Sequence, residues 1–321
     1  MARHYLDHAS SSPARPEVVE AMLRWLGSAA DPGRVHTEGR LARAAVEDAR
    51  EQVAALLGAR PREVVFTSGA TEAIAAAVHG ATERGAHLVC PAVEHSAVRE
   101  ASARHDVTLV GADGNGRVDP DEVLAAVRPG ETVLVHLQWA NHEVATLQPV
   151  AEVVAACRDR GVLVHLDAAA AAGHLPVDFA VVDADLLSVS AHKLGGPQGV
   201  GALLVRRGLR LRPLLVGGAQ ERARRAGTEN VAAIVGFGTA ADLLATGDRL
   251  DAETGASRAL TERALAAARA VDGVVAYGDP VARLPHIVCV GVAGVEAEAV
   301  LLGLDQAGVA AHSGSACSSE A

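Results

Sequence analysis

Lysine and aromatic residues are both scarce in this 321-residue chain. Only one of its 29 basic residues is a lysine, Lys193, and aromatic residues make up 2% of the sequence. A core with so few rings has to be built from Ala, Val and Leu. Arginine keeps a positive charge but does not act as an amine nucleophile, so the one retained lysine indicates a position that needs an amine. The alternative is a lysine that survives by chance in a surface ion pair.

Other absences exclude several classes of protein. The four cysteines are scattered and form no CxxC pair, which argues against a disulfide framework and a zinc site. There is no apolar run of about 18 residues, and no apolar stretch follows Arg3, so we expect neither a membrane span nor a signal peptide. A cytoplasmic location is therefore expected. The net charge of −10, without a basic run, disfavours direct nucleic-acid binding.

Short apolar runs alternate with amphipathic stretches, which predicts an α/β fold with a mainly parallel sheet covered by helices. The predicted strands span residues 63–67, 87–91, 132–138, 161–166, 186–190 and 202–206. The predicted helices between and after them span residues 41–57, 71–84, 119–127, 150–160 and 231–244.

The last part of the chain is interpreted as a smaller α+β domain. The polar stretch 246–257 is interpreted as a boundary, and it is followed by a predicted helix at 258–271, a strand at 286–292 and a helix at 295–307. We therefore expect a large domain of residues 13–250 and a small domain formed by residues 1–12 and 251–321.

Open parallel sheets bind ligands beyond the carboxyl ends of their strands, so residues that follow a strand are the candidates for chemistry. The first strand runs into Ser68-Gly69-Ala70-Thr71-Glu72. A glycine turn at the start of a helix offers backbone amides to a phosphate. Capping of the helix by the Ser68 or Thr71 side chain would explain the same pattern.

Two further predicted strands lead to residues that could take part in chemistry, one to an acid and the other to an amine. Asp167 follows a buried strand, where a carboxylate is costly unless it meets a cation, although a helix cap would also account for it. Lys193 stands at the mouth of the sheet, where its amine could bond to the carbonyl of a cofactor. A ring nitrogen held by Asp167 would complete the electron sink of a pyridoxal site. Its phosphate would be anchored by Ala70, Thr71, Ser190 and His192.

His95 follows the predicted strand 87–91. A lone histidine in this place is most often solvated or a helix cap. Beside a flat ring it could instead stack and move protons.

Six motifs occur in the order found in cysteine desulfurases. They are Thr67-Ser68-Gly69-Ala70-Thr71-Glu72, Glu94-His95, His165-Leu166-Asp167-Ala168, Ser190-Ala191-His192-Lys193, Arg225-Ala226-Gly227-Thr228-Glu229-Asn230 and Ser313-Gly314-Ser315-Ala316-Cys317. From Tyr5 to its last residue the chain resembles this family. It is most similar to the group whose cysteine lies in a longer loop and which supplies iron–sulfur assembly and tRNA thiolation.

The resemblance implies a fold-type-I enzyme that uses pyridoxal 5′-phosphate. Lys193 would carry the cofactor, Asp167 would hold its ring nitrogen, and His95 would stack on the ring and assist proton transfer. Thr228 would reach the phosphate of the neighbouring subunit in a homodimer. The polar run Ser313-Gly314-Ser315-Ala316-Cys317 is expected to be flexible, so that the Cys317 thiol would be exposed and able to react. Cys317 would take the sulfur of L-cysteine as a persulfide, leave L-alanine, and pass the sulfur to an acceptor protein.

Four departures from the family pattern bear on activity. His142 stands where the family has a second Asn that contacts substrate or cofactor, and Ala170 stands where a Gln touches the cofactor's phenolic oxygen. Ala73-Ile74-Ala75 replaces a polar continuation of the helix that follows Thr71-Glu72. The chain also stops at Ala321, whereas relatives continue, complete the small domain and supply an arginine for the substrate carboxylate. We therefore expect a truncated small domain.

Two other functions remain open at this stage. The chain could be another enzyme of the same superfamily, such as a selenocysteine lyase, a C–S lyase or a transaminase-like enzyme. It could also be an inactive fragment that retains the fold.

Overall fold

A seven-stranded sheet forms the centre of the molecule in the computed structural model, which describes residues 3–29 and 31–314. The order across the sheet is β2 (Val64–Thr67), β8 (Gly201–Val205), β7 (Leu186–Ser190), β6 (Leu163–Asp167), β5 (Thr132–Gln138), β3 (His87–Pro91) and β4 (Asp106–Val110). Among these seven strands, β8 runs antiparallel to the other six, which are parallel to one another. The predicted mainly parallel sheet is therefore confirmed.

Gly201 brings the ends of β2 and β7 to the same edge of the sheet. It starts β8 and is in register with both Thr67 and Ser190, so β2 and β7 run parallel to each other on either side of it. A side chain would not fit here, because a Cβ on Gly201 would lie 2.7 Å from the Gly69 Cα. This close approach places the turn after β2 beside the turn after β7.

Helices cover both faces of the sheet. On one face, α3 (Ala70–Ala81) and α4 (Ser96–Ser102) pack their small apolar residues on the sheet. The other face is covered by α2 (Thr37–Leu56), α5 (Pro120–Ala126), α6 (Val150–Asp159) and α9 (Val231–Ala245), with α1 (Pro16–Leu26) against α9. The largest fully buried side chains include many leucines and only one aromatic ring, Phe237, which agrees with the composition.

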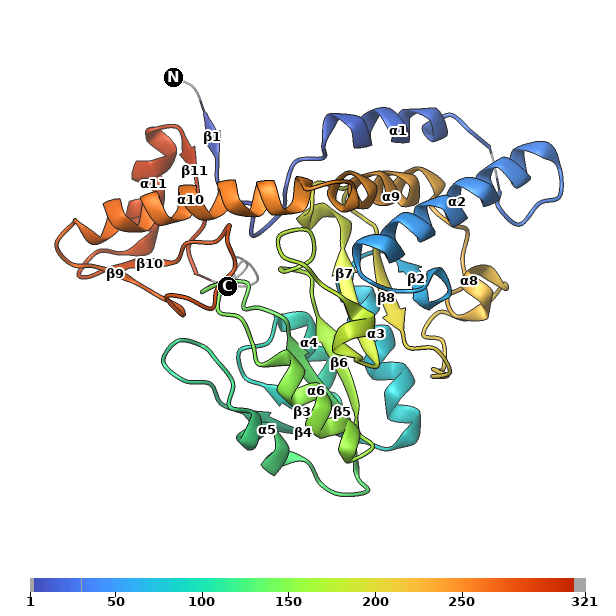
Figure 1. Ribbon diagram of the computed structural model, residues 1–321, viewed down its shortest axis with the longest axis horizontal. Helices are drawn as coiled ribbons and strands as arrows, with labels where there is room; N and C mark the ends of the chain where they lie inside the picture. The colour runs from blue at the N-terminus through green and yellow to red at the C-terminus, as the bar shows by residue number, and fades with distance from the viewer. Residues whose placement is uncertain (1–2, 30, 315–321) are drawn as a thin grey trace.

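The C-terminal part forms a smaller group of elements beside the sheet (Figure 1). It contains α10 (Arg249–Arg269), β9 (Val274–Ala276), β10 (Val290–Val292), α11 (Ala297–Gln306) and β11 (Val309–Ala310). β11 pairs in parallel with β1 (His4–Tyr5), and β9 pairs with β10. The remaining short helical segments are η1 (Pro61–Glu63), η2 (Thr82–Arg84), α7 (Phe179–Val182), η3 (Ala191–Lys193) and α8 (Gln220–Ala223).

The predictions for two segments of this part are wrong. The helix expected from residue 258 begins at Arg249 instead, so most of the predicted boundary stretch is helical. The polar residues of this stretch reflect an exposed helix and not a loop, since Leu265 is the one buried residue of α10. The strand expected at 286–292 is reduced to β10, since side-chain hydrogen bonds to the carbonyls of Pro285 and Ile287 hold the preceding chain outside the sheet.

Within the part of the chain that the structure describes, no single helix is long and apolar enough to cross a membrane. Taken together, α9 and α10 have the length and composition of a membrane span, but the two helices meet at an angle of 81°.

Candidate active site

A cavity of about 510 Å³ opens at the carboxyl ends of the strands. Its walls come from the turns after β2, β3, β5, β6 and β7 and from the segment that precedes α1. A volume of this size is typical of small-molecule sites. Seven residues predicted from the sequence line it: Ala70, Thr71, His95, Asp167, Ser190, His192 and Lys193. The convergence that the sequence analysis assumed is therefore confirmed for these seven.

The first turn of α3 forms one wall of the cavity. Its N-cap is Gly69, which has no side chain to offer and adopts a φ of +153°. Side-chain capping by Ser68 or Thr71 is therefore not what the structure has. The start of α3 presents backbone amides and the positive end of the helix dipole, an arrangement that suits a phosphate.

Asp167 is the last residue of β6 and is buried. Its Oδ1 accepts hydrogen bonds from the Ala169 amide at 3.0 Å and from the Ser188 hydroxyl at 3.3 Å. Burial raises the pKa of this carboxyl, and the two hydrogen bonds and the positive charges of His95 and Lys193 oppose that rise only in part. A cation seated in the cavity would stabilise the carboxylate further, which is the environment that a protonated ring nitrogen needs.

Lys193 ends η3, one turn beyond β7. Its ammonium donates hydrogen bonds to the carbonyl of Ala9 and, at 2.9 Å, to the carbonyl of Ser10. The amine thus lies where the N-terminal segment meets the cavity. Beside it, burial and the Lys193 charge lower the pKa of His192 to about 4, so His192 is neutral near pH 7 and shares a 3.2 Å contact with the Ser11 hydroxyl.

His95 caps α4 and meets a second histidine. Its Nδ1 accepts a hydrogen bond from the Ala97 amide at 3.0 Å, which leaves the Nε2 to hold a proton in the neutral ring. The ring of His142 packs edge-on against it, with centroids 5.1 Å apart. Burial, followed by the charges of His95 and Lys193, lowers the pKa of His142 to about 4.

A buried acid ties the His95 turn to the end of β5. Glu94 accepts the amide hydrogen of Gln138, and the Gln138 side chain donates to the Val93 carbonyl at 2.9 Å. Burial, with the nearby charge of Asp167, raises the pKa of Glu94 well above its usual range. Burial therefore favours the neutral form of Glu94, whose hydrogen bond to Gln138 links the His95 turn to β5.

Sequence reasoning missed several residues of the cavity. Gln138 ends a predicted strand, so the rule that identified Asp167 could have found it. Ser10, Ser11 and Gln198 follow no strand, and only the tertiary fold brings them to the cavity.

Two predicted residues do not join this group. Thr228 is exposed and does not line the cavity of its own chain. Cys317 lies outside the described residues.

His142 and Ala170, which depart from the family pattern, both line the cavity. The structure thus places the altered positions at the site itself and not at its periphery.

Comparison with known proteins finds relatives that match nearly the whole chain. The family model described as Aminotransferase class-V matches residues 4–321. A cysteine desulfurase from Trichormus azollae is 41% identical over 98% of this chain and 80% of its own length. A putative cysteine desulfurase, IscS 1, from Bacillus subtilis strain 168 is 41% identical over 99% of this chain and 86% of its own length.

Solved structures show the same relationship. A NifS-like protein superposes with a TM-score of 0.91 at 31% identity, over 96% of this chain and 87% of that one. SspA, solved in complex with cysteine, superposes with a TM-score of 0.72 at 35% identity, over 74% of this chain and 72% of that one.

Proposed function

We propose that this chain, which belongs to the cysteine desulfurases of the class-V aminotransferase family, holds its pyridoxal 5′-phosphate on Lys193 and takes the sulfur of L-cysteine onto Cys317. The observation that carries the proposal is that the single lysine and a buried carboxylate, Asp167, line one cavity. When bound, the cofactor draws electrons from the substrate and so weakens its C–S bond. The solved SspA complex with cysteine supports L-cysteine as the substrate.

The described residues fit the cofactor in the chemistry of their donor groups. Asp167 would face the ring nitrogen, because it is a buried carboxylate whose pKa is raised by burial. The first turn of α3, at Ala70 and Thr71, would hold the phosphate through backbone amides, with Ser190 and His192 beside it.

The proton-handling groups in this scheme are Lys193 and His95. The Lys193 amine donates to the carbonyls of Ala9 and Ser10, and it can act as a nucleophile only in its unprotonated form. The Ala97 amide donates its hydrogen to the Nδ1 of His95. The His95 Nε2 is therefore the atom that would hold and release protons. Protonation of this buried ring is disfavoured, since burial lowers its pKa.

The assembly belongs to the proposal as well. In a cytoplasmic homodimer, Thr228 would complete the phosphate site of the neighbouring subunit, and its exposed position away from its own cavity supports this. In this scheme residues 13–250 form the cofactor-binding domain, and residues 1–12 with 251–321 form the small domain. A sulfur-acceptor protein for iron–sulfur assembly or tRNA thiolation would then receive the sulfur from Cys317.

The test of cofactor attachment is borohydride reduction of the protein loaded with pyridoxal 5′-phosphate. Mass spectrometry should find the reduced adduct on Lys193 and on no other residue. The chain is well suited to this test because Lys193 is its only lysine, so the amino terminus is the only competing amine. The matched control is Lys193→Arg, which keeps the charge and should form no adduct. An adduct confined to the amino terminus would refute the assignment.

The sulfur acceptor is tested with Cys317→Ser. This variant should bind the cofactor and L-cysteine as the wild type does. It should form no persulfide, and it should release alanine more slowly than the wild type. Cys289→Ser is the control, since Cys289 lies in a different part of the chain and should leave turnover unchanged. Turnover by Cys317→Ser at the wild-type rate would identify a lyase instead.

A further inference from the structure

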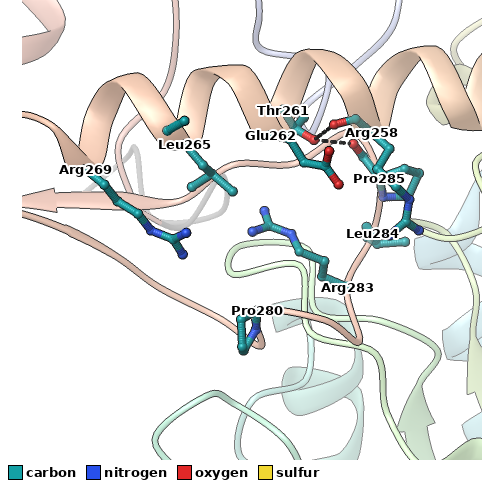
Figure 2. A pocket seen from close by; sticks show the side chains of 10 residues that line it. Arg258, Thr261, Glu262, Leu265, Arg269, Pro280, Arg283, Leu284 and Pro285 are labelled. Atoms are coloured by element: carbon teal, nitrogen blue, oxygen red, sulfur yellow. Dashed lines mark hydrogen bonds between the residues drawn. The ribbon is translucent and has the colours of Figure 1, made fainter.

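A second cavity, of about 240 Å³, lies away from the cofactor site, between α10 and the segment 280–285. Three arginines line it and define what we call the arginine pocket: Arg258 and Arg269 from α10, and Arg283 from the facing segment. Figure 2 shows Arg269 and Arg283 extending from opposite walls toward the same space. Glu262 is the one acidic residue that lines it, so the lining carries more positive than negative charge.

Arg283 is the most informative residue of the arginine pocket. It is only 8% exposed, and its guanidinium donates to the carbonyl of Ile287. None of the three guanidiniums forms an ion pair with a carboxylate in the described part of the chain. Burial, followed by the charges of Arg269 and Arg258, lowers the pKa of Arg283. A buried cation normally has an anionic partner, because an unpaired buried charge is costly.

The walls of the arginine pocket are held in place before any ligand arrives. Thr261 donates to the Pro285 carbonyl at 2.8 Å and so fixes the facing segment to α10. Leu265 and Leu284 are buried and supply apolar surface beside the charges. Exclusion of water by such surface strengthens the attraction between a guanidinium and an anion.

We propose that the arginine pocket binds a small dianion with a phosphate group, either inorganic phosphate or a small phosphate monoester. The volume suits such a ligand, since it is about half that of the cofactor cavity. Guanidinium groups form paired hydrogen bonds with phosphate oxygens, and three guanidiniums opposed by one carboxylate match a charge of about two.

The test is a calorimetric titration of inorganic phosphate into the holoenzyme at constant ionic strength. The bound cofactor's own phosphate then fills the active site, so the remaining binding reports on the arginine pocket. One saturable site is expected in the wild type. Arg269→Gln should weaken binding about tenfold or more, because it removes a charge-assisted contact. Arg258→Gln should act in the same direction, and both positions are exposed enough to change without loss of the fold.

The matched control is Arg263→Gln, which makes the same charge change on an exposed residue of α10 that does not line the arginine pocket. It should bind phosphate as the wild type does. If Arg263→Gln and Arg269→Gln weaken phosphate binding equally, the effect comes from net charge alone and the proposal is overturned. The absence of saturable binding would also overturn it.

Titration with glycerol phosphate distinguishes inorganic phosphate from a phosphate monoester as the ligand. Tighter binding of glycerol phosphate than of inorganic phosphate identifies a monoester. Preference for malonate, a dicarboxylate, over both would refute the assignment to phosphate.

Discussion

The Arg225 guanidinium binds both carboxylate oxygens of Glu72, through its Nε at 2.8 Å and its Nη2 at 3.1 Å. Glu72 also accepts the Ser68 amide hydrogen at 2.8 Å. Burial acts to raise the pKa of Glu72, but the hydrogen bonds from Arg225 and Ser68 outweigh it and lower the pKa. This pair joins the loop that carries Thr228 to the start of α3, so it connects two parts of the proposed phosphate site.

The first prediction is that Glu72→Ala weakens cofactor binding about tenfold or more, because the Ser68 amide and Arg225 lose their shared anchor. An absorbance titration with pyridoxal 5′-phosphate measures the dissociation constant. Arg225→Lys keeps the charge but loses the paired hydrogen bonds, so it should fall between the wild type and Glu72→Ala. Equal affinity in all three proteins would show that the pair does not position the site.

Sequence reasoning succeeded where burial on both faces of the sheet leaves a continuous apolar run. The bounds of β5 and β7 were predicted correctly, and from them the places of Lys193 and the surrounding cavity followed. It failed where a solvated helix looks like a loop, as in the first turns of α10. It could not find Ser10 and Ser11, because they reach the cavity through the path of the N-terminal segment and not through a strand end.

A second prediction concerns a buried ion pair beside β2. Arg50 and Glu221 are joined by two hydrogen bonds of 2.7 Å, and their side chains are 1% and 2% exposed. Glu221 also accepts the Phe66 amide hydrogen at 2.9 Å. Arg50→Met leaves a buried carboxylate without its cation and should lower the free energy of unfolding by about 3–5 kcal/mol.

Urea unfolding of the two single variants and the double variant tests this. Arg50→Met with Glu221→Met removes both charges together, so it should be more stable than Arg50→Met alone. If the effects of the two single changes simply add, the two charges do not stabilise each other, and the prediction is wrong.

A third prediction uses Lys193 to probe the charge inside the cavity. The Lys193 ammonium contributes to the lowered pKa values of His142 and His192, each about 4, and burial is the larger cause for both. Lys193→Met should therefore raise both pKa values, measured by NMR titration of the ring protons. His174 is an internal control, because it contacts the Lys193 backbone carbonyl, which the variant keeps. Unchanged values for His142 and His192 would mean that the ammonium does not act across the cavity.

The last prediction concerns two histidines in the middle of the sheet. His136 on β5 and His165 on β6 are both fully buried, and their Nδ1 atoms lie 3.0 Å apart. In the described part of the chain, the Nε2 of each ring has no hydrogen-bond partner. Burial lowers the pKa of His136 to about 3, and burial with the charge of His136 lowers the pKa of His165 well below its usual value. Both rings are therefore neutral in the folded protein.

The unfolded chain binds protons on these rings below about pH 6.5, whereas the folded protein does not. Because the unfolded state binds more protons, the free energy of unfolding falls as the pH drops from about 6.5 toward 4, by up to roughly 1.4 kcal/mol per pH unit for each ring. Urea unfolding between about pH 5 and pH 8 measures this slope. The double variant His136→Leu with His165→Leu should show a shallower slope, since neither ring remains to be protonated on unfolding. His312→Leu, at an exposed position, should keep the wild-type slope, and an equally steep slope in the double variant would contradict the prediction.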